Sequence, residues 1–188
     1  RSLSMLLALA VVLSFCAVPA FADDETASSE VVAKIGDAEY TTLGAALGEV
    51  KDNETIAIQK DFSETMGYTV TGVEFTIDLC GHAVSAESQK VGSQTFSIML
   101  TGTSKMTITD SSANKTGKFI VNSPETGSSV RGIIVSSAKT DNVSLNLDGV
   151  TLEVAKDAKL DMAVIYRPNT GSLNVKNSKI DTSKRDIK

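Results

Sequence analysis

The sequence predicts an all-β fold, a parallel β-helix (solenoid) closed at its N-terminal end by one amphipathic helix. Three observations predict it: short segments alternate apolar and polar residues, apolar residues recur in three columns, and turn-forming residues follow in register. Fixed spacing of roughly 30 residues is typical of folds in which each repeat buries its apolar side against its neighbours. The columns are Ile98, Ile134 and Ile165; Ile77, Ile108, Leu145 and Val175; and Val84, Ile120, Leu152 and Ile180.

The N-terminal part of the folded region predicts one short strand and then the helix. Val32–Ile35 is expected to be a strand that closes with the turn Gly36-Asp37. The helix is expected over about residues 41–51, with Thr41 or Thr42 as its N-cap. Its apolar residues are three or four positions apart and therefore share one face: Tyr40, Leu43, Leu47 and Val50.

Downstream of the helix, the sequence predicts only strands. Alternation with a period of two places the apolar side chains on one face of each strand. The expected strands are 55–58, 68–70, 75–79, 106–109, 143–147 and 173–175.

An antiparallel sandwich is the competing architecture. Two-residue hairpin turns are scarce, and Gly81, Gly149 and Asn177 follow the second column as turn formers. One long interval contains the polar segment 111–117, which can bulge outward as insertions in repeat folds do. These features favour the parallel fold.

The chain divides into three expected regions. Residues 1–22 have a charged start, an apolar run and a small-residue ending before Asp23, and they predict a signal peptide. Residues 23–31 predict a disordered acidic leader. Residues 32–188 form the expected β-helix domain. Because no helix covers its last strand pattern, we expect the domain to be truncated at Lys188 and the chain to be the N-terminal fragment of a longer protein.

The net charge limits the classes of expected partner, and the cysteine content suggests no reactive site. The net charge of −5 lacks the positive surface that phosphate backbones require, so nucleic acid is not an expected partner. No membrane insertion is expected after signal cleavage. Cys80 is left as the single cysteine of the mature chain, and we interpret it as a small hydrophobe in a strand.

Two stretches carry a family resemblance. Residues 33–43, with the helix and the segment 52–56, and then Thr76-Ile77-Asp78-Leu79-Cys80-Gly81-His82 resemble the start of right-handed parallel β-helix modules of pectin-lyase-like fold. Such modules occur in large adhesin-like surface proteins of Gram-positive gut bacteria. The resemblance implies a right-handed helix in a bacterial protein that is secreted or attached to the cell wall. Cys80 stands where the family usually has Asn.

A search for chemistry-bearing residues assigns no catalytic, cofactor-binding or metal-binding residue. Asp78, Asp110 and Asp148 could form an acidic stripe, but we interpret them as corner residues that bond the turn backbone. Arg131 and Arg167 could stack in neighbouring repeats, yet no paired Asp lies near them.

Two further features have structural interpretations. His82 has no identifiable orienting partner and is interpreted as a surface or packing residue. Asn146 and Asn174 occupy one position in consecutive repeats, with Asp78 expected there earlier, and predict a ladder of stacked amides that stabilises the fold.

The leading functional hypothesis is a non-catalytic scaffold, secreted or at the cell surface, that displays loops. Its expected partners are host or cell-wall glycans or proteins, and no cofactor is expected. Two alternatives stay open. One is a polysaccharide lyase or hydrolase with its site on coils outside this chain, and the other is a carbohydrate-binding module, for which the scarcity of aromatic residues is unfavourable.

Overall fold

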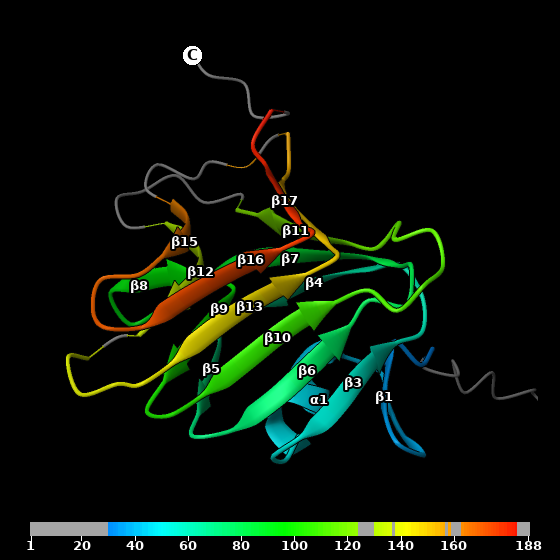
Figure 1. The fold of residues 1–188 in the computed structure, drawn as a ribbon, viewed down its shortest axis with the longest axis horizontal. Coiled ribbons are helices and arrows are strands. Elements are labelled where there is room, and N and C mark those ends of the chain that lie inside the picture. Colours follow the sequence, from blue (N-terminus) through cyan, green and yellow to red (C-terminus); the bar gives the residue numbers. More distant parts are fainter. Residues whose placement is uncertain (1–29, 124–129, 137, 157, 159–162, 184–188) are drawn as a thin grey trace, which may run out of the picture.

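A computed structural model describes residues 30–123, 130–136, 138–156, 158 and 163–183 (Figure 1). The expectations for residues 1–22, for most of the leader 23–31 and for the end at Lys188 lie outside the described residues. The elements in chain order are β1 (Ala33–Ile35), β2 (Ala38–Tyr40), α1 (Leu43–Glu49), β3 (Glu54–Ile58), β4 (Phe62–Met66), β5 (Tyr68–Thr71), β6 (Glu74–Asp78), β7 (Ala83–Val91), β8 (Gln94–Phe96), β9 (Ile98–Thr101), β10 (Lys105–Thr109), β11 (Lys118–Asn122), β12 (Arg131–Val135), β13 (Ser144–Asp148), β14 (Thr151–Val154), β15 (Ala163–Tyr166), β16 (Ser172–Lys176) and β17 (Lys179–Asp181).

The strands form three sheets around a common apolar core. The first sheet has the order β16-β13-β10-β6-β3-β1-β2, the second β17-β14-β11-β7-β4, and the third β15-β12-β9-β5. Figure 1 shows the first sheet as a row of neighbouring arrows from β16 to β1. Within each sheet, most neighbouring strands pair in parallel. Paired strands come from successive repeats of the apolar columns in the sequence.

The predicted right-handed parallel β-helix is corrected by this topology. The structure has three sheets, and the largest is mixed, because β1 pairs antiparallel with both β2 and β3. A second antiparallel pair, β7 with β8, lies beside the second sheet. The turn at Gly36, with φ of 56°, folds β2 back onto β1. Column spacing predicted which distant strands are neighbours, but it contains no information on strand direction in such local hairpins.

The register also corrects each column at one position. The structure pairs Ile133 with Ile98 and Ile165, Leu147 with Ile108 and Val175, and Phe119 with Val84 and Leu152. Spacing had predicted the apolar neighbours Ile134, Leu145 and Ile120 in these places. A period of two cannot choose between candidates that are all apolar, and only the pleat of the folded strand decides which one aligns.

Helix α1 lies inside the expected range of 41–51. Thr42 is the N-cap, and its hydroxyl oxygen accepts a hydrogen bond from Ala45 N at 3.1 Å. The helix packs on β1, β2 and β5 and buries Leu43, Ala46 and Leu47. Within the described part of the chain, no helix is long and apolar enough to cross a membrane.

A carboxylate from another strand fixes the start of α1. Glu64 in β4 accepts hydrogen bonds from Leu43 N at 2.7 Å and Gly44 N at 3.0 Å, and from the Tyr68 hydroxyl at 2.9 Å. Burial, together with the bond to Glu64, raises the pKa of Tyr68 to about 12. Because the first N–H groups of a helix lack partners within it, Glu64 completes the cap and ties the helix to the strands.

Candidate functional site

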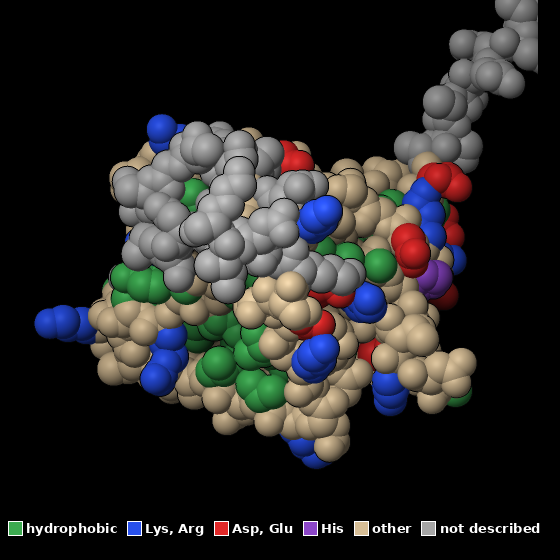
Figure 2. All heavy atoms as spheres, turned by 90° about the horizontal axis from the view of Figure 1, so that it is seen from above, with side chains coloured by type: hydrophobic (Ala, Val, Ile, Leu, Met, Phe, Trp, Pro, Cys, Tyr) green, Lys and Arg blue, Asp and Glu red, His purple; other side chains and the backbone are tan. Residues whose placement is uncertain are grey.

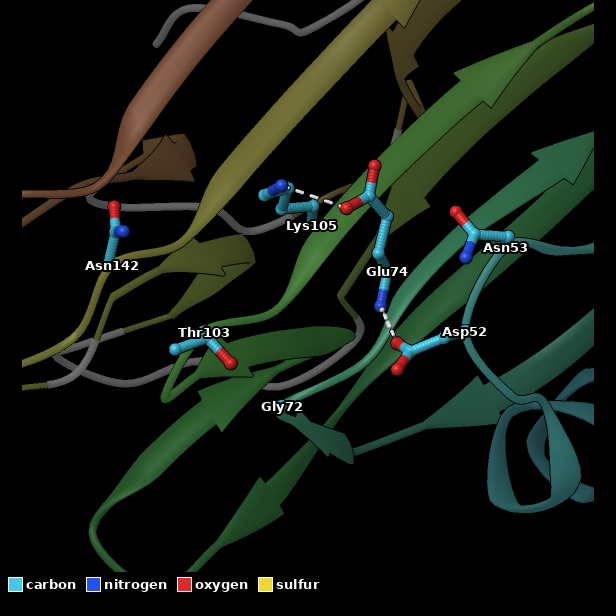
Figure 3. A pocket seen from close by; sticks show the side chains of 7 residues that line it. All are labelled: Asp52, Asn53, Gly72, Glu74, Thr103, Lys105 and Asn142. Carbon is cyan, nitrogen blue, oxygen red and sulfur yellow. Dashed lines mark hydrogen bonds and ion pairs between the residues drawn. The ribbon is translucent and has the colours of Figure 1, made fainter.

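A polar pocket lies where four neighbouring strands of the first sheet begin. Its volume is about 410 Å³, and its lining residues come from just before or at the starts of β3, β6, β10 and β13. Figure 3 shows these side chains around the depression: Asp52, Asn53, Gly72, Glu74, Thr103, Lys105 and Asn142. None of these residues was identified as a site residue from the sequence, because they come together only through strand pairing.

Two interactions hold the charged groups of this pocket. Asp52 Oδ1 accepts a hydrogen bond from Glu74 N at 2.8 Å, and Glu74 Oε2 lies 2.8 Å from Lys105 Nζ. Glu74 and Lys105 are direct neighbours in the parallel pairing of β6 with β10. The hydrogen bond from Lys105 to Glu74 raises the pKa of the Lys105 ammonium above its usual value.

The backbone under the pocket is held by tight turns. Gly72 has a φ of 74°, and its N–H donates to Ser104 Oγ at 2.8 Å. Asn53 also adopts a positive φ, of 67°, and its N–H donates to the carbonyl of Glu74 at 2.6 Å. Asn142 N donates to Gly102 O at 2.7 Å. The polar groups therefore stand on a fixed frame and could receive a ligand rich in hydroxyl groups.

Asp78 and Asp110 behave as the corner residues predicted from the sequence. Asp78 Oδ1 accepts from Cys80 N at 3.0 Å and Ser111 N at 2.9 Å. Burial opposes ionisation of Asp78, but its hydrogen bonds from Ser111 and Cys80 outweigh burial and lower its pKa. These bonds fix the corner after β6 to the corner after β10.

Asp110 fastens the insertion at 111–117. Its Oδ1 accepts from Gly81 N at 2.8 Å and Ser112 N at 2.9 Å, and its Oδ2 accepts from Gly117 N at 2.6 Å. Asp110 is completely buried. Burial opposes ionisation, yet the N–H donors, led by Ser112 and Gly117, lower the pKa of this carboxyl. The segment 111–117, which was predicted to bulge outward, is therefore a loop held by hydrogen bonds to Asp110.

The acidic stripe does not form. In the paired strands, Thr109 of β10 lies between Asp78 of β6 and Asp148 of β13. Asp110 is the next residue after Thr109 in the chain, so the three carboxylates do not form one row. Asp148 instead lies 3.6 Å from Lys176 Nζ. Among the described residues, no three His, Cys, Asp or Glu side chains gather closely enough to hold a metal ion.

His82 has a partner that the sequence did not reveal. Its Nδ1 lies 3.1 Å from Asp61 Oδ1, which also accepts from Ala83 N at 3.0 Å. The backbone bond from Ala83, followed by the contact with His82, lowers the pKa of Asp61. The two residues are 21 positions apart and no motif links them. Their pairing follows from the alignment of β4 with β7.

The two arginines do not stack on each other. Arg131 pairs in register with Ala163, and its guanidinium lies 4.1 Å from the centre of the Tyr166 ring. Arg167 Nη1 donates to Gly171 O at 2.7 Å. Both side chains therefore serve local structure.

The amide ladder is confirmed, with one correction. Asn174 Nδ2 donates to Asn146 Oδ1 at 2.8 Å, and Asn146 Nδ2 donates to Thr107 Oγ1 at 3.2 Å. The earlier position in this row is Thr107, and Thr76 precedes it, whereas Asp78 lies outside the row.

Cys80 is a half-buried free cysteine at a corner, with a φ of 48°. Burial and then the nearby Asp78 charge raise the pKa of its thiol. A thiol that stays protonated is a poor nucleophile. The predicted strand position is wrong, because β6 ends at Asp78 and Cys80 lies in the turn that follows.

No family model, no curated protein and no solved structure matches this chain. The resemblance to Gram-positive surface modules, the secreted or wall-attached location and the predicted partners therefore stay predictions.

Proposed function

We propose that this chain is a non-catalytic scaffold module, secreted or attached to the cell surface, that displays loops to host or cell-wall glycans or proteins. The observation that carries the proposal is the fastening of the loop 111–117 by Asp110. A buried carboxylate accepts three backbone hydrogen bonds, from both ends of the loop and from Gly81 of the preceding corner.

Fastening matters for display because an ordered loop loses little conformational entropy when it binds. Further contacts support the loop: Lys115 Nζ donates to the carbonyl of Asp110, and Thr116 Oγ1 donates to Gly81 O at 3.2 Å. Gly117 lies so close to Asp110 and Leu79 that an added Cβ would be 2.7 Å from each. The loop is therefore held in one shape on a firm support.

The substitution Asp110→Asn tests the support. The amide NH₂ would face an N–H donor, so we expect a loss of about 2–3 kcal/mol in the free energy of unfolding and faster proteolytic cleavage between residues 111 and 117. Asp148→Asn is the matched control, because Asp148 is half exposed and makes only a long ion pair. Equal cleavage of both variants would contradict the proposed fastening.

The display function itself is tested with the purified chain on immobilised bacterial cell walls and host mucins. We expect binding that Asp110→Asn weakens, with no release of reducing ends or unsaturated uronic acids from pectin or other polysaccharides. Turnover of any polysaccharide would replace the scaffold by the lyase or hydrolase alternative. Binding that is unchanged by loosening the loop would reject loop display.

The polar pocket favours carbohydrate binding as a second candidate function. Carboxylate, amide, hydroxyl and ammonium groups line one depression of about 410 Å³ and match the hydrogen-bonding groups of a sugar. A glycan array with the wild type and with Glu74→Gln tests it, and we expect weak binding that the variant loses. Lys60→Gln is the control, because this lysine pairs with Glu30 and does not line the pocket. No binding to any glycan would remove this candidate.

A further inference from the structure

The lining of the polar pocket follows the order of the strands in the first sheet. Asp52 and Asn53 precede β3, Glu74 begins β6, Lys105 begins β10, and Asn142 precedes β13. These four strands are successive neighbours in the sheet. Because neighbouring strands lie about 4.8 Å apart, the lining extends over roughly 14 Å across the sheet. This length exceeds a single sugar ring and suits a chain of rings that crosses the strands.

The polar groups of the pocket keep hydrogen-bonding capacity for a ligand. Within the described residues, the side chains of Asn53, Thr103 and Asn142 make no hydrogen bond to the protein. Asp52 and Glu74 each use one carboxylate oxygen inside the pocket and keep the second one. Carboxylates accept, whereas amides and hydroxyls both donate and accept, as the hydroxyl groups of a sugar do. The mixed set of free groups therefore matches a sugar chain.

The composition of the lining is unfavourable for two other ligand classes. No apolar side chain lines the pocket, so it offers no contact for the apolar side chains of a peptide. Figure 2, turned by 90° from Figure 1, shows that hydrophobic side chains gather on another side of the molecule. Two carboxylates accompany the single ammonium of Lys105, and the chain has a net charge of −5, so an anionic ligand is repelled.

Two threonine hydroxyls lie beside the pocket on the same face of the sheet. Thr76 and Thr107 come two positions after Glu74 and Lys105, so alternation places all four side chains on one face of β6 and β10. Thr76 and Thr107 are neighbours in register and are half-buried. Figure 1 shows β3, β6, β10 and β13 as the front layer, with α1 behind them. The two hydroxyls therefore extend the polar surface along the strands.

The amide row fixes the role of the Thr107 hydroxyl. Asn174 Nδ2 donates to Asn146 Oδ1 at 2.8 Å, and Asn146 Nδ2 donates to Thr107 Oγ1 at 3.2 Å. Because the Thr107 oxygen already accepts, its own O–H is left to donate, and it has no acceptor within the part of the chain that the structure describes. An oriented donor therefore lies next to the pocket.

We propose that the pocket and the hydroxyls of Thr76 and Thr107 together bind an uncharged linear oligosaccharide of about three units, which lies across β3, β6, β10 and β13. The inference rests on the carbohydrate-binding function proposed above and adds the length, direction and charge of the ligand. Sugar hydroxyls bond Asp52, Glu74 and Asn142, and Thr107 donates to an oxygen of the chain. Because no aromatic side chain lines the pocket, binding comes from hydrogen bonds and is weak.

Titration of the full chain with defined sugars, followed by NMR, tests the length and charge of the ligand. We expect cellotriose to bind about tenfold or more tightly than glucose, because it reaches all four strands, and cellotetraose to add no more than about twofold. Trigalacturonic acid is equally long but anionic and should bind about fivefold or more weakly than cellotriose. Equal affinities for glucose and cellotriose would overturn the proposed length, and equal affinities for the two trisaccharides would overturn the preference for uncharged chains.

Thr107→Val tests the hydroxyl beside the pocket. Valine has nearly the same shape but cannot donate, so we expect cellotriose to bind about fivefold more weakly while glucose binding stays unchanged. Thr109→Val is the matched control on the same strand and face, because the Thr109 hydroxyl already donates to Asp148 O at 3.1 Å. Circular dichroism verifies that both variants fold. Equal cellotriose affinities of the two variants would reject the role of Thr107.

The outcomes separate this inference from the function on which it rests. Glucose binding that Glu74→Gln abolishes, with no gain for cellotriose, would leave a sugar pocket without the extended ligand and would reject the inference alone. No binding of any sugar would remove the carbohydrate-binding function and the inference with it.

Discussion

The three sheets are covered to different degrees at their two ends. At the end near β1 and β5, α1 lies against the strands, Leu43 is fully buried, and Glu64 bonds the first two N–H groups of the helix. At the end formed by β16 and β17, apolar side chains of the same columns are more than a third exposed. Within the described residues, α1 packs over one end, whereas the apolar side chains of β16 and β17 stay partly exposed at the other.

This difference shows that apolar patterning does not by itself bury a side chain. Leu173 continues the same alternation as Leu145, its buried neighbour. Burial requires a following layer, and each end must obtain it from a helix, a strand or another molecule. Truncation of an apolar side chain should therefore lower the free energy of unfolding by very different amounts at the two ends.

The largest expected effect comes from the same truncation made at both ends. Leu43→Ala should lower the free energy of unfolding by about 2–5 kcal/mol, because it leaves a cavity under the helix. Leu173→Ala should cost about 1 kcal/mol or less, because its side chain is already partly in water. Urea denaturation, at a concentration where the chain is monomeric, measures both values. Equal costs would break the contrast between the ends.

A smaller effect is expected from the two helix glycines. An added Cβ at Gly44 would lie 2.0 Å from Tyr68 Cζ, whereas a Cβ at Gly48 would meet no atom within 4 Å. Gly44→Ala should displace the Tyr68 ring and destabilise the fold by about 1–3 kcal/mol.

Gly48→Ala is the matched control in the same helix. It should be neutral or stabilising, by up to about 1 kcal/mol, because alanine favours helix more than glycine does. Thermal unfolding of the two variants measures the difference. A neutral Gly44→Ala would show that α1 docks less closely on Tyr68 than the structure indicates.

The smallest expected effect concerns acid. Folding lowers the pKa of Asp110, so this carboxylate contributes stability above its unfolded pKa of about 4, and the contribution is lost as the pH falls through the lower folded value. Hydrogen exchange should show the amides of Ser112 and Gly117 losing protection from about pH 4 downward.

Asp181 at the end of β17 provides the control for this acid experiment. Lys179 and Ser183 also lower its pKa, but both are only two residues away in the chain, so this carboxyl joins no distant segments. We expect Asp181→Asn to leave the acid stability of the fold unchanged, whereas Asp110→Asn should remove the acid-dependent step at the loop. An identical pH response in both variants would show that the buried corner carboxylate has no special role.

Local features of the sequence predicted much of the fold's content. Alternation located most strands, and the spacing of Leu43 and Leu47 located the helix, because such periodicities depend on side-chain direction along a single segment. Column spacing also predicted that distant strands pair in parallel. It failed on the overall architecture, since the hairpins β1–β2 and β7–β8 place antiparallel strands beside the parallel ones.

The candidate site was less accessible to sequence reasoning. Asp78 and Asp110 were predictable as corner residues because an Asp after a strand bonds its own turn. The pocket around Glu74 and Lys105 was not predictable, because its members are spread from residue 52 to residue 142 and meet only when four strands align. The Asp61–His82 contact is of the same kind.

The sequence by itself therefore determined the mainly β composition, the helix α1, the corner carboxylates Asp78 and Asp110 and the amide row from Asn146 to Asn174. The tertiary structure alone decided the three sheets with their mixed edge, the residue that aligns at each column position, the pocket and the exposed end. The physical reason is that alternation and turn chemistry are properties of a short segment. Strand direction, register and coverage depend instead on which segments pack against each other, and hydrophobic burial rewards any register that places an apolar side chain inside.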